Sequence, residues 1–195
     1  LKKDKIVVAK DQLLKMNQAI PNLPYNGAFY TTAPFKKYVE FGKYDRAKMD
    51  AAIKPLKVDF DVFGRLTPLG DGLTEIDAVL SKMGGNCINM ILMTDGENNL
   101  GSDPVAAAKA LYAKYPGKLY IHIISFADTK DGKAILDSIA AMNKDAQYVQ
   151  AESLQSDMAI KAFVEKVFCG AAAAPAADRI ILRGINFDFD KYNIR

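Results

Sequence analysis

The stretch Met90–Asn99, which reads MILMTDGENN, decides how the rest of the sequence is interpreted. An apolar run ends here on Asp95 and a glycine, and a short apolar run that stops at a turn signal predicts a buried strand. A carboxylate at the end of such a strand is a candidate ligand for a hard cation, because these ions prefer oxygen. Aspartate is also common as a cap of turns and helices, and this stretch alone favours neither interpretation.

The sequence on either side of this stretch alternates between predicted strands and predicted helices. The strands are expected over residues 26–32, 58–63, 88–93, 119–126 and 147–150. The helices are expected over residues 5–20, 44–53, 76–83, 103–115, 131–143 and 153–168. Apolar strands separated by amphipathic helices are typical of a parallel sheet that is covered on both faces. We therefore expect an α/β fold with one doubly wound, mostly parallel sheet, plus a partial strand at the C-terminus.

The composition excludes several classes of function. Of the 195 residues, 50% are hydrophobic and 25% are charged, which is typical of a globular chain. The 26 basic and 23 acidic residues leave a net charge of +3 without a basic stripe, so we expect no nucleic-acid partner. No apolar run approaches the roughly 18 residues of a membrane-spanning helix. The chain begins on Leu1 rather than Met, and we expect it to be part of a longer protein.

Motifs typical of enzymes are missing from the sequence. It holds no nucleophile elbow, no phosphate-binding loop and no dinucleotide fingerprint. The single histidine, His122, lies inside a predicted strand, and we expect it to be a buried structural residue. The protein is therefore expected to be non-catalytic. The alternative from the enzyme class is a metal-dependent hydrolase that uses Asp95 together with Asp71 or Glu97.

A second loop precedes the Asp95 strand by one helix and reads TPLGDGL over Thr67–Leu73. Both loops are expected at the same edge of the sheet, where the carboxyl ends of parallel strands meet. The T-x-x-G and T-D-G motifs, in this order, resemble the von Willebrand factor A domain, and the resemblance covers residues 1–170. It implies a fold of the von Willebrand or Rossmann-like type, with Thr67 and Asp95 as ligands of Mg²⁺ or another divalent cation. It also implies that a carboxylate of a partner protein completes the site.

The remaining metal loop of that family is missing from the sequence. This loop has the pattern D-x-S-x-S and follows the first strand of the domain, and we expect both to lie upstream of Leu1. Without this central strand, two apolar inner edges of the sheet are expected to be unpaired. The alternative is a metal-free structural module in which the site is degenerate.

The composition changes in the C-terminal part of the chain. Residues 171–178 read AAAAPAAD and are expected to form a linker. Residues 179–195 include LRGINFDFDKYNIR, which resembles the first strand of an OmpA-type peptidoglycan-binding domain. The resemblance implies a periplasmic protein associated with the outer membrane or cell wall, and tethered to peptidoglycan by residues beyond Arg195. An unrelated edge hairpin or C-terminal strand is the alternative, because short alternating runs arise easily.

The two cysteines carry one further prediction. Cys87 lies at the start of the Asp95 strand and Cys169 at the end of the last helix, so both are expected at the face opposite the metal loops. In an oxidising periplasm we expect a disulfide, worth roughly 4 to 5 kcal/mol on the chain-entropy model before strain is subtracted. Mass spectrometry under non-reducing conditions measures this directly, and two free thiols would contradict it.

Overall fold

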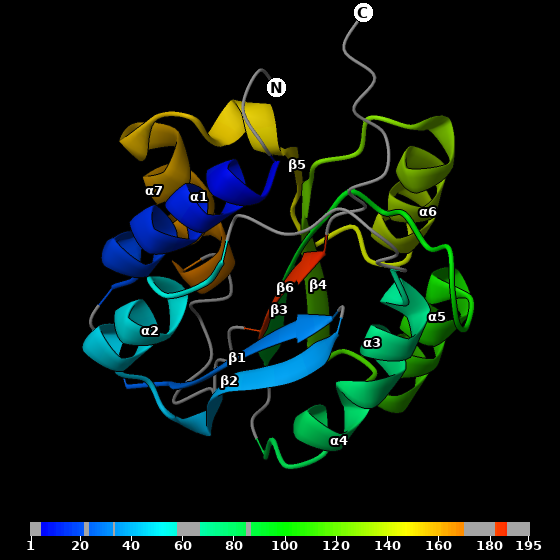
Figure 1. Cartoon of the computed structure of the whole chain (residues 1–195). Helices are drawn as coiled ribbons and strands as arrows, with labels where there is room; N and C mark the ends of the chain where they lie inside the picture. The colour runs from blue at the N-terminus through cyan, green and yellow to red at the C-terminus, as the bar shows by residue number, and fades with distance from the viewer. Residues whose placement is uncertain are drawn as a thin grey trace, which may run out of the picture.

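A parallel sheet forms the centre of the computed structural model, which describes residues 5–21, 24–32, 34–57, 67–84, 87–169 and 182–186. Its strands are β3 (Ile88–Thr94), β4 (Leu119–Ser125), β5 (Tyr148–Gln150) and β6 (Leu182–Asn186). Their order is β5-β4-β3-β6, and every neighbouring pair is parallel. β3 therefore lies inside the sheet, with a partner strand on each side (Figure 1).

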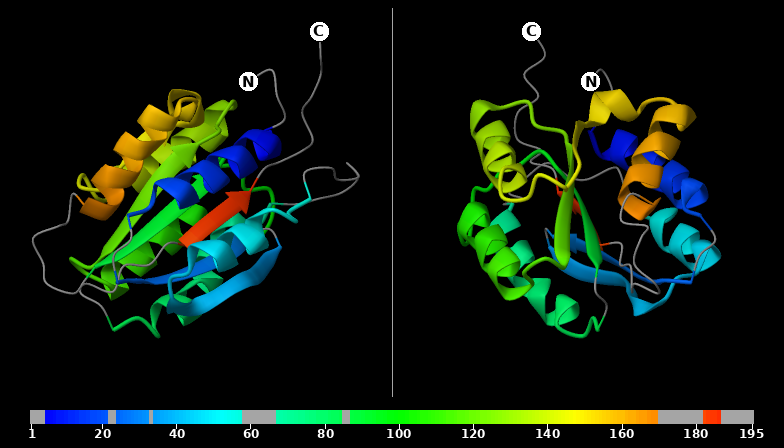
Figure 2. Two further views of the ribbon diagram at one scale, coloured as in Figure 1. Left: turned by 90° about the vertical axis from the view of Figure 1, so that its left-hand side faces the viewer. Right: turned by 180° about the vertical axis from the view of Figure 1, so that it is seen from behind.

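A separate antiparallel hairpin lies beside this sheet. It consists of β1 (Asn26–Thr32) and β2 (Phe35–Lys43), and its register is irregular between Gly27 and Tyr30. β1 contacts β6 without joining its sheet, and Figure 2 shows β6 between the hairpin and the rest of the parallel sheet. The hairpin thus extends the strand layer without extending its hydrogen-bonded ladder.

The expectation of one doubly wound, mostly parallel sheet is wrong, because the strands form two sheets. The α/β character is found in the parallel sheet alone. The sequence interpretation missed β2, whose residues FKKYVEFGK are exposed or half-buried except for Val39. The sequence of β2 lacks the apolar run that would predict a strand, because β2 is stabilised by local antiparallel pairing with β1 rather than by burial on both faces.

Helices cover both faces of the parallel sheet (Figures 1 and 2). On one side lie α1 (Lys5–Ala19), α2 (Arg46–Ile53) and α7 (Asp157–Cys169), preceded by the short 3₁₀ helix η1 (Ala151–Leu154). On the other side lie α3 (Leu69–Glu75), α4 (Asp77–Leu80), α5 (Pro104–Lys114) and α6 (Lys130–Ala140). Among the described residues, no helix is long and apolar enough to cross a bilayer.

The side chains of β3 divide the hydrophobic core into two parts. Ile91 and Met93 belong to the cluster under α1 and α7, whereas Met90 and Leu92 belong to the cluster under α3, α5 and α6. This alternation follows from the two-residue period of a strand. Every residue of β3 is buried, so the strand has the continuous apolar run that the sequence showed.

Several predictions for the chain ends and loops concern residues that the structure does not describe. The strand expected over residues 58–63 and the linker over 171–178 both lie outside the described residues. Of the tail, the structure describes only residues 182–186, and it pairs them with β3. The expectation of unpaired inner edges is therefore wrong for β3. That the tail opens a second domain stays a prediction.

His122 lies in β4 and is only 3% exposed. Its Nδ1 accepts a hydrogen bond of 2.9 Å from the backbone N–H of Gln147. The ring proton is therefore on Nε2, which donates to Oδ1 of Asn89 at 3.1 Å. Burial lowers the pKa of His122 to about 4. The prediction of a buried structural histidine is confirmed.

We expect the free energy of unfolding to decrease as the pH falls from about 6.5 to about 4. In this range His122 binds a proton in the unfolded chain but not in the folded one, so protonation favours unfolding. The difference between the two pKa values corresponds to about 3 kcal/mol. Urea unfolding at several pH values measures the effect, and the His122→Gln variant should lack this part of it. An equal decrease in both proteins would contradict the prediction.

Candidate functional site

Asp95 is held at the carboxyl end of β3 and is 1% exposed. Its Oδ1 accepts a hydrogen bond of 3.2 Å from the backbone N–H of Glu97, and the N–H of Gly96 donates to the hydroxyl of Thr94 at 3.1 Å. Asp95 thus caps its own turn, while Asp103 caps the following helix α5. One carboxylate oxygen is thus used in the turn, and the other, Oδ2, lies near the ammonium group of Lys5.

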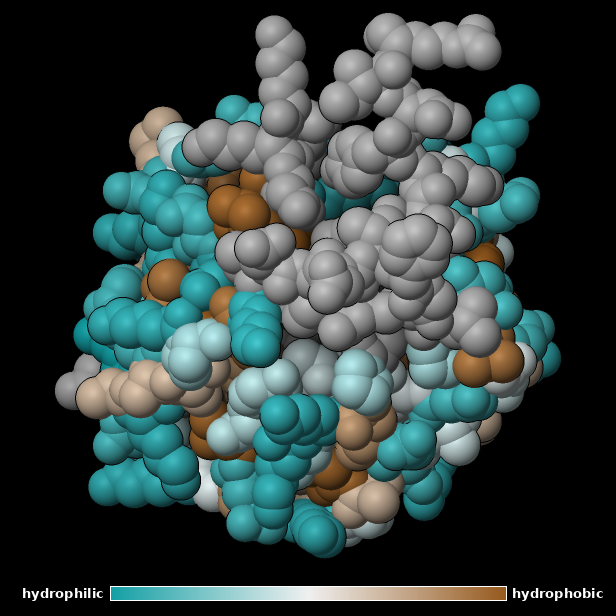
Figure 3. Space-filling view, viewed as in Figure 1, coloured by the Kyte–Doolittle hydropathy of each residue, from teal (hydrophilic) through white to brown (hydrophobic). Residues whose placement is uncertain are grey.

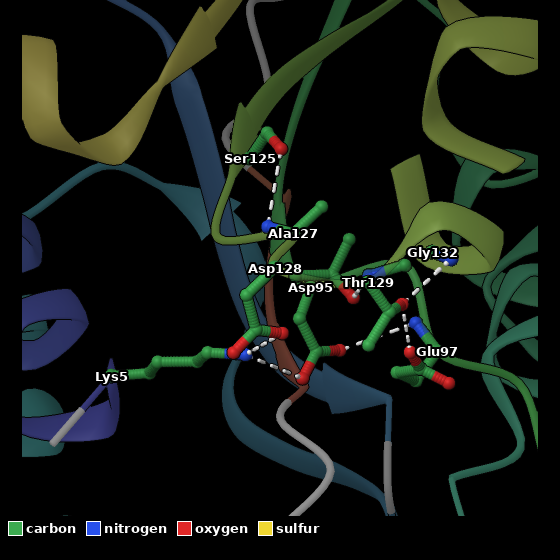
Figure 4. A network of polar contacts seen from close by, with 10 residues as sticks. Lys5, Asp95, Glu97, Ser125, Ala127, Asp128, Thr129 and Gly132 are labelled. Carbon is green, nitrogen blue, oxygen red and sulfur yellow. Dashed lines mark hydrogen bonds and ion pairs between the residues drawn. The ribbon is translucent and has the colours of Figure 1, made fainter. Parts of the chain in front are cut away.

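The ammonium group of Lys5 is a partner of this second oxygen. Lys5 is the first residue of α1, and its Nζ lies 3.7 Å from Oδ2 of Asp95 and 2.6 Å from Oδ1 of Asp128. Figure 4 shows the lysine side chain reaching both carboxylates, which follow the neighbouring strands β3 and β4. A buried carboxylate is costly unless a positive charge compensates it, and Lys5 supplies that charge here.

The stretch Thr67–Leu73, which was predicted as a loop, is mostly helical because α3 begins at Leu69, and two asparagines join it to the loop of Asp95. The backbone N–H of Thr67 donates to Oδ1 of Asn99 at 2.6 Å, and the N–H of Asn99 donates to the carbonyl of Thr67 at 3.2 Å. The N–H of Gly70 donates to Oδ1 of Asn98 at 3.1 Å. The structure therefore brings the two predicted metal loops together. Sequence reasoning missed the role of the asparagines, because their hydrogen bonds reach backbone groups far away in the sequence and leave no local signal.

We expect the Asn99→Ala variant to lose about 1 kcal/mol of unfolding free energy, because the Thr67 N–H loses its acceptor. Asn99→Asp retains an acceptor oxygen at the same position and is the matched control. Urea unfolding of both variants measures the difference. Equal stability of Asn99→Ala and the unchanged protein would show that the loops are held together by other contacts.

The two acidic residues proposed for a hydrolase, Asp71 within α3 and Glu97 in the loop after β3, both accept hydrogen bonds from neighbouring segments. Asp71 accepts hydrogen bonds from the hydroxyl of Ser102 at 2.7 Å and from its backbone N–H at 2.9 Å, and these bonds lower the pKa of the Asp71 carboxyl. Glu97 accepts a hydrogen bond from the hydroxyl of Thr129, which also caps α6. Neither arrangement supplies a base or nucleophile beside Asp95, so the geometry gives the hydrolase alternative no support.

The side chains at this edge of the sheet carry oxygen atoms, which are the ligands that a hard cation prefers. Asp95 offers a carboxylate and Thr67, which is 2% exposed, offers a hydroxyl. Among the described residues, no three His, Cys, Asp or Glu side chains gather into a metal cage. Ligands from elsewhere would therefore be needed to complete an octahedral shell around Mg²⁺.

Cys87 is buried, and its Sγ lies 3.8 Å from Oδ1 of Asn89. The side chain of Cys169 lies outside the described residues. The disulfide between Cys87 and Cys169 therefore stays a prediction.

In the part of the chain that the structure describes, few large apolar side chains are exposed. On the face seen in Figure 3, hydrophobic residues show only in small areas between hydrophilic ones. The most exposed large hydrophobic residues of the described chain are Val7 on α1, Leu100 in the loop after β3 and Met158 on α7.

Comparison with known proteins finds similarity in structure only. No family model matches the chain, and no curated protein matches it. A solved structure of the conserved hypothetical protein BatB from Bacteroides thetaiotaomicron is similar, with a TM-score of 0.63 and 17% identity over 86% of this chain and 89% of that one. An aerotolerance-related membrane protein from Bacteroides fragilis, carrying multiple mutations to serine, gives a TM-score of 0.60 and 16% identity over 83% and 87%.

These similarities show a shared fold. They show no more than the fold, so the resemblance to the von Willebrand factor A domain stays a prediction. They do not bear on the OmpA-type resemblance of the tail, which stays a prediction.

Proposed function

We propose that this chain is a von Willebrand factor A-like domain of a bacterial envelope protein that binds a partner protein through a divalent cation. The observation that carries the proposal is the buried carboxylate of Asp95 at the end of β3, with the Thr67 loop fixed beside it by Asn99. Parallel α/β sheets place their ligand sites at this edge. A carboxylate and a hydroxyl there are oxygen ligands suited to Mg²⁺.

In this proposal the residues of the chain have separate tasks. Asp95 and Thr67 would hold the cation, and the N–H of Glu97 would fix the orientation of the carboxylate. Asn98 and Asn99 would keep the second loop at the right distance. The remaining oxygens would come from the D-x-S-x-S loop expected upstream of Leu1 and from a carboxylate of the partner. The cation contributes electrostatic attraction for that carboxylate, and no catalytic step is involved.

The envelope location is part of the same proposal. One structural neighbour is described as an aerotolerance-related membrane protein, and the fold is shared with it. The Ala/Pro-rich residues 171–178 would act as a spacer, and the OmpA-like tail would lead into a peptidoglycan-binding domain. This arrangement would display the domain in the periplasm, next to the outer membrane or cell wall. We expect protein partners and no nucleic acid.

Calorimetric titration with Mg²⁺ and Mn²⁺ tests the cation site. The protein is used with the sequence expected upstream of Leu1, in parallel with its Asp95→Ala variant. Asp145→Ala is the control, because Asp145 is exposed and precedes β5 at the opposite edge of the sheet. Binding that only Asp95→Ala loses would support the proposal. Absence of binding heat in the unchanged protein would contradict it.

A metal-free structural module is the second candidate, and one observation favours it. The ammonium group of Lys5 lies 3.7 Å from Oδ2 of Asp95, so the carboxylate has a positive charge beside it that is not a metal ion. The same titration separates the two candidates, because a metal-free module binds neither Mg²⁺ nor Mn²⁺.

A further inference from the structure

We propose that Lys5 is a built-in counter-ion of Asp95 and that its ammonium group competes with a divalent cation for this carboxylate. The competition rests on the proposed cation site, whereas the role of Lys5 as counter-ion can be tested without it. If the proposal holds, a cation binds to Asp95 only when the side chain of Lys5, at the start of α1, has moved away.

The position of the ammonium group is the first argument. Nζ of Lys5 lies 3.7 Å from Oδ2 of Asp95, the oxygen that is not used in the Glu97 turn. It lies closer to Asp128, at 2.6 Å. Lys5 therefore stands between the loops that follow β3 and β4 (Figure 4), where the carboxylate of Asp95 would meet a cation.

The burial of the three side chains is the second argument. The side chain of Asp95 is 0% exposed and that of Lys5 is 11% exposed, whereas that of Asp128 is 59% exposed. Water therefore screens the charge of Asp128 but does little for Asp95. The contact with Lys5 therefore matters more to the charge of Asp95 than to that of Asp128, and Asp128 also holds the ammonium group in place.

The chemistry of the two cations is the third argument. A divalent ion bound to Asp95 would stand within a few ångströms of the ammonium group, and like charges at such distances in a poorly hydrated site repel strongly. The ion can bind only if Lys5 swings away. The lysine has a flexible four-carbon stem, and the exposed Asp128 offers it an anchor nearer to solvent.

Two measurements test the proposal on the same set of variants. Lys5→Met removes the charge and keeps most of the apolar stem, and Lys5→Arg keeps the charge. Lys48→Met removes one charge from an exposed position on α2 and controls for the change in net charge. The first measurement is a double-mutant cycle of Lys5→Met and Asp95→Asn by urea unfolding. The second is calorimetric titration with Mn²⁺ of the protein that includes the sequence expected upstream of Leu1.

In the cycle, Lys5→Met alone should destabilise the protein, and Asp95→Asn should remove most of that loss, because the buried group that loses its ammonium partner is then neutral. Additive effects would overturn the role of Lys5 as counter-ion. In the titration, Lys5→Met should lower the Kd for Mn²⁺ by about tenfold or more, with Lys5→Arg and Lys48→Met unchanged. Equal Kd values for all variants would overturn the competition. Absence of Mn²⁺ binding in every variant would refute the proposed cation site and the competition with it, whereas the cycle would still decide the role of Lys5.

Discussion

The Gly96→Ala variant is expected to lose about 3 to 5 kcal/mol of unfolding free energy, which combines a backbone cost and a packing cost. Gly96 follows Asp95 directly and has a φ of 79°, a conformation that disfavours any residue with a Cβ. An added Cβ would overlap the carbonyl oxygen of Gly132 in α6 and would lie 2.8 Å from Cγ of Leu136. The turn and the helix approach too closely for a methyl group.

Gly117→Ala is the matched control for this prediction. Gly117 has a φ of 67°, so it has a similar backbone cost, but nothing lies within 4 Å of its added Cβ. It should lose only about 1 to 2 kcal/mol. Urea unfolding of the two variants separates strain in the backbone from contact with α6. Equal losses would mean that the contact between Gly96 and Gly132 relaxes at no cost.

The same glycine links stability to the proposed function. To relieve the overlap with α6, the turn after β3 must shift, and the carboxylate of Asp95 moves with it because the Glu97 N–H holds it. We therefore expect that any cation binding by this site is weakened in Gly96→Ala and preserved in Gly117→Ala.

The parts of the fold that the sequence predicted are those in which local pattern and burial agree. β3 and β4 are mostly apolar and buried, and the helices that follow them are capped by Asp103 and Thr129. The hairpin was only half predicted, because β2 is largely exposed and its strand character depends on pairing with β1. Antiparallel pairing at the surface leaves no apolar run in the exposed strand, even though its partner is its neighbour in the chain.

The candidate site shows the same division. The sequence indicated that Asp95 and Thr67 would lie close together. Their motifs were expected at the same edge of an α/β sheet, where the carboxyl ends of parallel strands meet. The contacts of Lys5 with Asp95 and Asp128 were not predictable, since they join the start of α1 to two distant loops. A lysine in a helical pattern is normally read as a solvated residue, and only the structure shows that this one is buried.

The second large effect is expected for the tail. Deletion of residues 182–195 should lower the free energy of unfolding by about 5 kcal/mol or more and promote aggregation. The deletion removes β6, which pairs with β3 from Met90 to Thr94. The backbone groups along that edge of a buried strand would lose their hydrogen-bond partners, and each such loss costs about 1 to 3 kcal/mol unless water replaces the partner.

Deletion of residues 187–195 is the control, because it leaves β6 in place. Urea unfolding gives the stability of both truncated chains, and light scattering reports on the exposed edge of β3. A difference between the two truncations would show that residues 182–186 belong to this sheet. Equal stability would show that β3 gains nothing from β6, as expected if the tail were only the opening of a second domain. The comparison thus decides whether the C-terminal strand contributes to the stability of this domain or only leads out of it.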